Sequence, residues 1–464
     1  MSELNDHFAA QAAVGARIDR LPMTRITWGI VILAGLAWFT EALSIGSLGV
    51  SIPTLKQVMH ITPSQIGLLV AAQTFGVVIG LIPAGRLADL FGRKRVLIYG
   101  IVWYSIFTFV CGLAPNYSFL LIARFLAGLG MGAVFPLPYA IVCEMVPKTR
   151  RTFCNGIMDA FLSLGYFVAP LLGFIIFPAL SPDYSWRVFF AVAASPILYS
   201  VLIYYKLPES PRWLARKGYQ REAERILDHL EAAIRRVTGR DLPEPARPRV
   251  QIAADVVGTS HMSQIFGRRL IMRTVARVVS ATGVFFMFYV VMTYMPTIFV
   301  SQGYKLATSL LFTAIITGAA LPGKIFNGIV GEMLGRRAAY VIFMGIAGCG
   351  ALLFGLAGSV VGSVTFGCIM SFFGTGAFPS LKMSLAEQYP LQLRATGAAT
   401  VEALSRLLGG VVGGFVMPVL LQRAGVEVSF VTIAVVAFIG VVVELTLTME
   451  TKNMTVEELE QIAA

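Results

Sequence analysis

Residues 85–94 read GRLADLFGRK, and residues 328–337 read GIVGEMLGRR. Both stretches follow one pattern: a glycine, three residues, an acid, two residues, a second glycine and two bases. A second pair of stretches repeats in the same order, because EMVP at 144–147 is matched by EQYP at 387–390. Duplicated motifs at matching places in two halves of a chain are typical of an internal repeat. The sequence therefore predicts a duplicated unit of six helices.

These motifs supply candidate residues for a gate at the inner membrane surface. The glycines let helix ends turn and let neighbouring helices approach closely. The acids and bases can form ion pairs that hold the two halves together in one state and break in the other. The alternative is that the bases only set the topology, since Arg and Lys are expected in any inner loop. The candidate gate residues are Gly85, Asp89, Gly92, Arg93, Glu144, Arg150, Glu332, Gly335, Arg336, Glu387 and Arg394.

The composition is that of a membrane protein. Of the 464 residues, 56% are hydrophobic and 13% are charged, with a mean hydropathy of +0.75. A soluble chain would carry about 25% charged residues, and several uncharged runs exceed the roughly 20 residues that cross a bilayer. We predict an all-α membrane protein with twelve transmembrane helices in two six-helix halves. The predicted spans are 26–52, 65–85, 96–114, 117–145, 153–178, 187–206, 274–300, 306–328, 338–357, 361–383, 395–420 and 427–448.

The polar segment 207–270 divides the chain into halves at 26–206 and 271–449, flanked by tails at 1–25 and 450–464. We expect amphipathic helices beside the membrane in the central segment, because its apolar residues recur at near-helical spacing. We expect the first tail to be mobile. The domains predicted are thus two membrane halves, one linker and two tails.

Lysine and arginine concentrate in the tails, the central segment and the motif loops. The positive-inside rule then predicts that both termini are cytoplasmic and that the chain crosses the inner (plasma) membrane many times. This bias accounts for the net charge of +12 without nucleic acid as a partner. The predicted outer loops hold only Lys56, Arg187, Lys305 and Arg423.

The chain carries no pattern of an enzyme. The four histidines fall outside the predicted spans, and no nucleophile elbow, nucleotide loop or metal-ligand spacing is present. The five cysteines lie in or beside apolar runs and are predicted to be free thiols. We therefore predict no metal, no cofactor and no enzymatic activity, and an ion or substrate gradient as the source of energy.

With these motifs the sequence resembles the major facilitator superfamily, and within it the sugar-porter-like branch that includes nicotinate-type carriers. Residues 208–214 (PESPRWL) resemble the segment after helix 6 of that branch, and Glu450-Thr451-Lys452 with Glu457 and Glu458 resembles its C-terminal signature. The resemblance covers about residues 26–455. It implies transport by alternating access, with substrates that range from sugars and organic cations to nicotinate-like acids.

The resemblance also implies a proton-coupling pair. In proton-coupled members an acid in helix 1 pairs with an arginine in helix 4, and Glu41 and Arg124 fall at the corresponding places. Opposite charge would stabilise ionised Glu41, and its protonation would free Arg124. The alternative is a static structural salt bridge.

Two cations depart from the sugar-carrier pattern. Lys382 and Arg406 stand where sugar carriers of the branch usually have large aromatic residues. Two cations favour an anionic ligand, since both side chains bind carboxylates through charge-assisted hydrogen bonds. Glu402 lies four residues before Arg406 and can pair with it. Asp159 is a further candidate, for either gate pairing or substrate contact, and Lys324 is expected to be a gate or interface residue.

Aromatic residues complete the expected site. Phe286 and Tyr289 of span 7 are expected to cover the face of an aromatic substrate, with Tyr139 of span 4 as a further contact. The predicted function is proton-coupled uptake of a small organic anion, an aromatic or aliphatic carboxylate. The alternatives are uptake or efflux of an organic cation, zwitterion or sugar, and a receptor that has lost transport. The partners expected are the solute, protons and the lipid bilayer, with the monomer as the functional unit.

Overall fold

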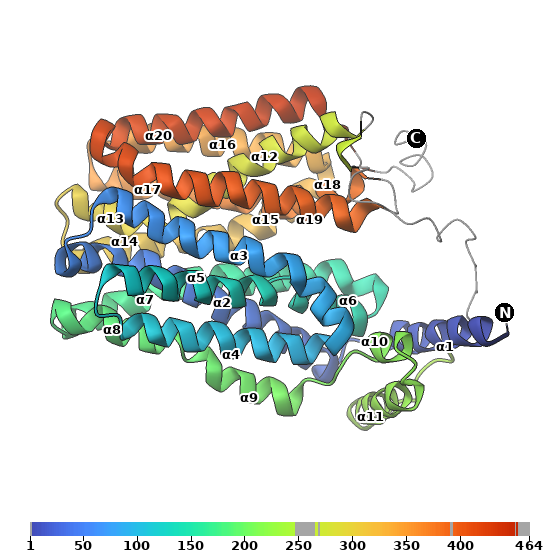
Figure 1. Ribbon diagram of the computed structural model, residues 1–464. Coiled ribbons are helices and arrows are strands. Elements are labelled where there is room, and N and C mark those ends of the chain that lie inside the picture. Colours follow the sequence, from blue (N-terminus) through green and yellow to red (C-terminus); the bar gives the residue numbers. More distant parts are fainter. Residues whose placement is uncertain (1, 246–264, 268–269, 390–392, 451, 453–464) are drawn as a thin grey trace.

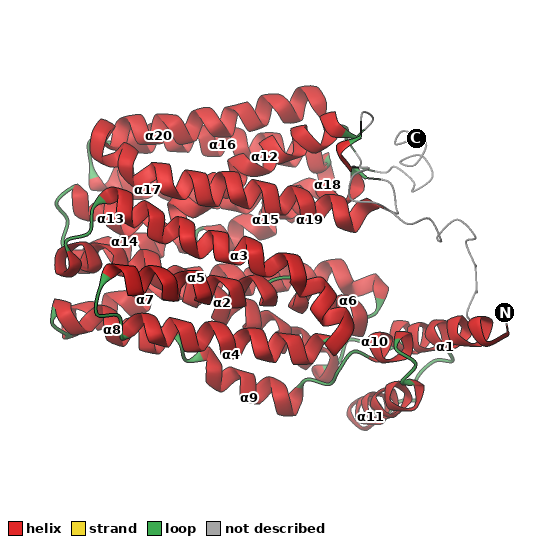
Figure 2. Ribbon diagram, viewed as in Figure 1, coloured by secondary structure: helices red, strands yellow, loops and turns green. Residues whose placement is uncertain are grey.

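The computed structural model describes residues 2–245, 265–267, 270–389, 393–450 and 452. Every regular element among them is helical, as Figure 2 shows in red. The helices form two groups, with α2–α9 in blue to green and α12–α20 in yellow to red (Figure 1). The predicted all-α membrane fold is confirmed. Glu457 and Glu458, which carry part of the family resemblance, lie outside the described residues.

The first group follows the order of the predicted spans. Proline breaks two of its spans, because proline lacks the N–H that continues a helix. Pro136 lies between α5 and α6, Pro138 lies in the first turn of α6, and Pro196 begins α9. The elements are α2 (Arg25–Met59), α3 (Pro63–Phe91), α4 (Arg93–Gly112), α5 (Tyr117–Val134), α6 (Leu137–Met145), η1 (Lys148–Arg150), α7 (Arg151–Ala179), α8 (Pro182–Ala193) and α9 (Pro196–Lys206).

The second group contains two π-helical segments, η4 and η7. Such segments are rare inside α-helices and often occur at functional sites. The elements are α12 (Ile271–Tyr289), η4 (Val290–Tyr294), α13 (Met295–Ser301), α14 (Leu306–Gly318), α15 (Ala320–Leu334), α16 (Arg336–Gly355), α17 (Val360–Gly374), η5 (Thr375–Ala377), α18 (Phe378–Glu387), α19 (Arg394–Ser405), η7 (Arg406–Val412) and α20 (Gly413–Leu447).

The number of spans agrees with the sequence prediction. Eleven segments of the described chain are long and apolar enough to cross a membrane. The last of them, Thr396–Leu447, has 52 residues and contains the non-helical residue Gly425, with φ of 80°. A turn at this glycine divides the segment into two spans, which gives twelve.

The two groups meet most closely at the end of the bundle that lies opposite α1 and α11. A Cβ atom added to Gly49 of α2 would lie 2.7 Å from the carbonyl oxygen of Thr293, and one added to Gly67 of α3 would lie 2.6 Å from that of Phe415. Backbones in such contact need glycine. Along the middle, α7 packs against α14 and α15.

At the other end, called here the motif end because it holds residues 85–94 and 328–337, three short helices pack on the first group. They are α1 (Ser2–Asp19), α10 (Pro211–Arg216) and α11 (Gln220–Thr238) (Figure 1). Residues 2–19, which we expected to be a mobile tail, form a packed helix because Val14 and Ile18 are buried against Trp213 and Leu227.

Ion pairs fasten α1 to the linker helix α11. Arg17 contacts Asp228 at 2.6 Å and Glu231 at 2.9 Å, and Arg20 contacts Glu231 at 2.7 Å. Burial by itself raises the pKa of Glu231, but the hydrogen bonds from Arg17 and Arg20 outweigh it, so that the pKa of this carboxyl lies below its usual value. The linker helices and α1 therefore form one unit with the first group.

Candidate functional site

A cluster of charged side chains lies where the two groups of helices meet. Lys382 of α18 contacts Asp159 of α7, with 2.9 Å between Nζ and Oδ1. Lys324 of α15 donates a hydrogen bond from Nζ to the main-chain oxygen of Asp159 at 3.3 Å. Asp159 belongs to the first group and both lysines belong to the second. This ion pair therefore crosses between the halves.

Aromatic rings from both groups surround Lys382. Its Nζ lies 5.0 Å from the ring centroid of Trp38, and 5.9 Å from those of Phe135 and Phe378. Trp38 is held in place because its Nε1 donates to the main-chain oxygen of Phe135 at 2.9 Å and its ring stacks on the Phe135 ring. Cations over aromatic faces are attracted by the ring quadrupole. The Lys382 side chain keeps 30% of its surface exposed, which leaves it accessible to a ligand.

Arg406 forms the second part of the cluster. Its Nη2 contacts Glu402 at 2.9 Å, as the spacing of four residues predicted. The guanidinium lies 4.0 Å from the centroid of the Phe135 ring and 4.9 Å from that of Phe285. Arg406 is also the first residue of the π-helical segment η7. Phe135 thus lies against both cations, Lys382 on α18 and Arg406 on η7.

Glu41 and Arg124 do not pair, which corrects the contact expected from the family pattern. The Arg124 guanidinium donates to the main-chain oxygen of Ser44 at 3.4 Å and to Ser47 Oγ at 2.7 Å, and it lies 4.4 Å from the Phe190 ring centroid. These contacts hold it one to two turns of α2 beyond Glu41. Within the described part of the chain, neither carboxylate oxygen of buried Glu41 has a hydrogen-bond partner.

Arg406 of the second group approaches the part of α2 that carries Glu41, because its guanidinium lies 4.0 Å from the Phe135 ring centroid. Trp38 explains how this is possible, because it lies one turn before Glu41 on α2 and stacks on Phe135, which in turn contacts Arg406. Glu41 belongs to the first group and Arg406 to the second.

The aromatic residues that were predicted to contact the solute lie on α12 and α6. Phe286 packs against Gly413, the first residue of α20, and Tyr289 packs against Gly410 of the π-helical segment η7. Tyr139 is 49% exposed on α6 and has no ring contact with Lys382 among the described residues. Four further rings that were not predicted, Trp38, Phe135, Phe285 and Phe378, lie against the cations of the cluster. The two prolines after Phe135 were the available signal for that residue.

The first copy of the gate motif forms a dense network. Arg93 contacts Asp89 at 2.7 Å and Glu144 at 3.0 Å, and Glu144 also contacts Arg216 of α10 at 2.9 Å. The side chain of Glu209 caps α4 by accepting from the main-chain nitrogens of Arg93 at 2.9 Å and Lys94 at 3.1 Å. All of these residues belong to the first group or to the linker helices.

The second copy repeats the cap, and it has fewer ion pairs between residues that the structure describes. Glu450 accepts from the main-chain nitrogens of Arg336 at 3.0 Å and Arg337 at 3.1 Å, in the manner of Glu209. Arg336 contacts Glu387 at 3.3 Å. Over the described ranges Glu332 is exposed and makes no ion pair with Arg336, unlike Asp89 in the first copy.

Gly92 and Gly335 are required by the caps. Their φ angles are 102° and 106°, a backbone conformation that favours glycine. A Cβ on either would lie 2.3 Å from a carboxylate oxygen of its capping glutamate. Gly85 differs, because no atom lies within 4 Å of the place a Cβ would occupy. The close approach expected at Gly85 is therefore absent from this structure.

Two arginines of the predicted gate are not part of these networks. Arg150 is exposed and forms no ion pair within the described residues, whereas its neighbour Arg151 contacts Asp19 of α1 at 3.5 Å. Arg394 is the first residue of α19, and its side chain lies outside the described residues. In the part of the chain that is described, no ion pair of either motif copy joins the two groups, and the pairs of each copy lie within one half or its linker helices.

A buried ion pair inside the second group was not predicted. Arg277 of α12 and Glu444 of α20 are in contact at 2.8 Å, with side chains 1% and 0% exposed. Arg277 also donates to Ser384 Oγ of α18 at 3.1 Å. The pairing with Arg277 keeps Glu444 in the interior.

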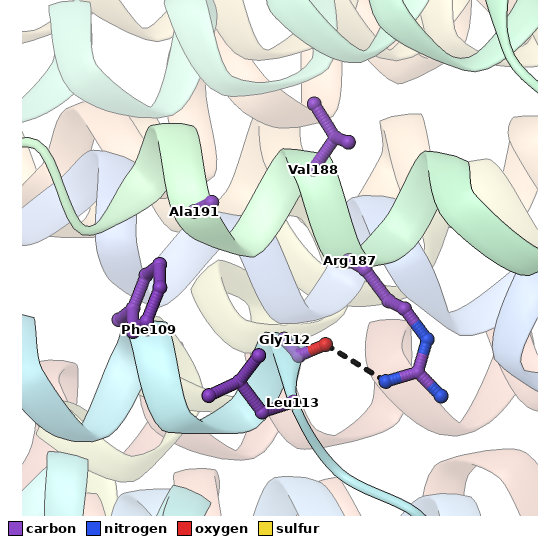
Figure 3. Close-up of a pocket in the computed structure, with 6 residues that line it drawn as sticks. All are labelled: Phe109, Gly112, Leu113, Arg187, Val188 and Ala191. Carbon is purple, nitrogen blue, oxygen red and sulfur yellow. Dashed lines mark hydrogen bonds between the residues drawn. The ribbon is translucent and has the colours of Figure 1, made fainter.

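A surface hollow lies apart from these charges. It is found at the non-motif end between α4 and α8, and Figure 3 shows Arg187 beside it donating to the main-chain oxygen of Gly112 at 2.9 Å. The Arg187 guanidinium also lies over the Trp186 ring. The other residues that line the hollow are apolar. Its lining residues are Phe109, Gly112, Leu113, Arg187, Val188 and Ala191. The described residues contain no group of His, Cys, Asp or Glu side chains suited to a metal ion.

The fold and its charged interface between two helical groups are those of a membrane transporter. Residues 27–397 match the Major Facilitator Superfamily, and the chain belongs to that family. It is 30% identical to the niacin transporter NiaP of Acinetobacter baylyi over 96% of this chain and 99% of that one. It is 28% identical to the 4-hydroxybenzoate transporter PcaK of the same organism, over 88% of this chain and 87% of that one.

Among solved structures, the inward-open xylose transporter XylE of Escherichia coli resembles the chain with a TM-score of 0.74 and 18% identity. The alignment covers 94% of this chain and 99% of that one. The family and these relatives confirm that the chain is a multi-pass membrane transporter and not an enzyme. Sequence resemblance had indicated the same family.

Proposed function

We propose that this transporter takes up a small aromatic monocarboxylate together with a proton, by alternating access. The observation that carries the proposal is Lys382, a partly exposed cation enclosed by Trp38, Phe135 and Phe378 from both halves. A carboxylate can bind the ammonium while its ring packs on the aromatic faces. Two relatives with long alignments, named as niacin and 4-hydroxybenzoate transporters, support this class of solute.

The charges of the interface support coupling to a proton. They comprise three cations and three acids, which sum to zero when all are ionised. A proton on Glu41 would leave one positive charge, which a monocarboxylate would neutralise. A net charge of zero at the site favours the change of access from one side of the membrane to the other, because uncompensated charge within the membrane is costly. The residues in this sum are Lys324, Lys382, Arg406, Glu41, Asp159 and Glu402.

The orientation and oligomeric state belong to the same proposal. The bias of basic residues favours a cytoplasmic motif end, with both termini inside. The halves pack closely at the opposite end, so we infer that the site opens toward the cytoplasm in this state. The site is composed of one chain alone, which favours a monomer as the functional unit.

Uptake into proteoliposomes tests the proposal. The full-length protein is supplied with benzoate, nicotinate, nicotinamide, benzylamine or glucose, with and without an inward proton gradient. We expect uptake of the two carboxylates, stimulated about tenfold by the gradient, and little uptake of the other three. Uptake of benzylamine that no carboxylate inhibits would contradict the anion assignment.

A further inference from the structure

We propose that Asp159 is a built-in mimic of the substrate carboxylate, which holds Lys382 in the empty transporter and is displaced when substrate binds. The inference rests on the proposed function, because it assumes a carboxylate ligand at Lys382. It assigns Asp159 a positioning role that goes beyond that function. Three observations carry it: the geometry of the pair, the excess of positive charge and the placement of Lys324.

The geometry is that of a carboxylate ligand on a lysine. Asp159 Oδ1 lies 2.9 Å from Lys382 Nζ, the distance of a charge-assisted hydrogen bond. The Asp159 side chain is 8% exposed, whereas that of Lys382 is 30% exposed. A solute can therefore reach the exposed part of Lys382. The carboxylate of the solute then competes with Asp159 for the Lys382 ammonium group.

The local charge fits one additional anion. Lys324, Lys382 and Asp159 together carry one net positive charge, and Glu402 already neutralises Arg406. One monocarboxylate makes this group of three neutral, whereas a dicarboxylate would leave it negative. The arrangement thus selects for monoanions as well as for carboxylates.

Lys324 provides a second partner for the displaced aspartate. Its Nζ is bonded to the main-chain oxygen of Asp159, and it makes no ion pair with the carboxylate in the described structure. A side-chain rotation of Asp159 would bring the carboxylate toward this ammonium. Because a buried charge without a partner is costly, Lys324 makes the exchange feasible.

The exchange also alters the contact between the halves. Asp159 lies on α7 of the first group, and Lys382 lies on α18 of the second. Release of this pair by the substrate removes a direct ion pair between the two groups. Binding of a solute is thereby linked to the relative movement of the halves.

Equilibrium binding to the purified full-length protein tests the inference, with radiolabelled benzoate as the probe. In Asp159→Asn the competing carboxylate is absent, so we expect the Kd for benzoate to fall about tenfold. Phthalate, a dianion, should gain more than benzoate, because the group of three then carries two positive charges. The matched control is Asp228→Asn, which removes an exposed carboxylate from α11 and should leave the Kd unchanged.

A second variant keeps the test decisive if Asp159→Asn folds poorly. In Lys324→Gln the displaced aspartate has no second partner, so we expect the Kd for benzoate to rise about tenfold. Unchanged or weaker benzoate binding in a folded Asp159→Asn protein would overturn the inference, as would wild-type affinity in Lys324→Gln. If the wild-type protein bound no benzoate at all, the proposed function itself would fail.

Discussion

The ion pairs at the motif end and those at the centre of the bundle differ in what they connect. Arg93 with Asp89 and Glu144 lies wholly within the first half, and Arg336 with Glu387 lies wholly within the second. The Asp159–Lys382 pair joins the two halves. Pairs inside a half can persist while the halves move. Pairs between halves must break in each cycle, which makes them the places where a solute can act.

The two motif copies differ from each other as well. Both have a glutamate cap and a glycine with positive φ, but only the first copy is linked to α10 through Glu144 and Arg216. The helices α1 and α11 reinforce the same end. Among the described residues, the first half therefore carries the larger assembly at the motif end.

The largest effect is expected at Lys382. Lys382→Gln removes a charge-assisted contact to the solute, and we expect benzoate uptake by proteoliposomes to fall about 100-fold. Arg336→Gln is the matched comparison, since it neutralises a partly buried cation within one half, and its loss of uptake should be clearly smaller. Equal losses in the two variants would remove the distinction between the centre and the motif end.

Arg93 tests the difference between the two motif copies. Arg93→Gln leaves Glu144 with Arg216 as its cation and breaks the buried part of the network, at a cost of about 2 kcal/mol of stability. Arg336→Gln loses one longer contact and should cost about half as much. Thermal unfolding of the detergent-solubilised proteins measures both. A larger destabilisation by Arg336→Gln would reverse the comparison.

A substitution of Glu41 tests whether the central site couples uptake to a proton. Glu41→Gln imitates the protonated carboxyl, so we expect uptake to continue while its stimulation by an inward proton gradient falls by about tenfold. The measurement compares initial rates with and without the gradient. Asp89→Asn, at the motif end, is the control and should retain the stimulation. If the proton gradient stimulated uptake by Glu41→Gln as much as by the wild type, Glu41 would have no role in proton coupling.

The smallest effects are expected at the glycines that the two copies share. Gly92→Ala and Gly335→Ala each force a side chain into a left-handed backbone conformation against a capping carboxylate, at a cost of about 1–2 kcal/mol. Because the two caps have the same geometry, the two shifts in thermal midpoint should agree. Gly85→Ala has open space around it and should shift the midpoint little.

Local patterns in the sequence predicted much of this structure. The spans follow from apolar runs, the turns at the helix ends from glycines at fixed spacing, and the Glu402–Arg406 pair from a separation of four residues on one helix. Such features depend on neighbours in the chain. The family resemblance also predicted the fold correctly.

Contacts between distant helices could not be predicted in this way. Asp159 and Lys382 are 223 residues apart, and Arg277 and Glu444 are 167 residues apart. Arg124 was expected to pair with Glu41 because of its position in the family pattern. It instead contacts Ser44 and Ser47, which lie one to two turns farther along α2. Helix rotation decides such contacts, and periodicity does not determine rotation to that accuracy.

Isothermal titration with nicotinate and nicotinamide tests the central claim most directly. The two ligands share a ring and differ in a carboxylate against a neutral amide, so their ratio isolates recognition of the charge. We predict that the wild-type protein binds nicotinate at least about tenfold more tightly than nicotinamide, and that Lys382→Gln abolishes this preference. Equal affinities in the wild type, or a preference that survives in Lys382→Gln, would contradict the account.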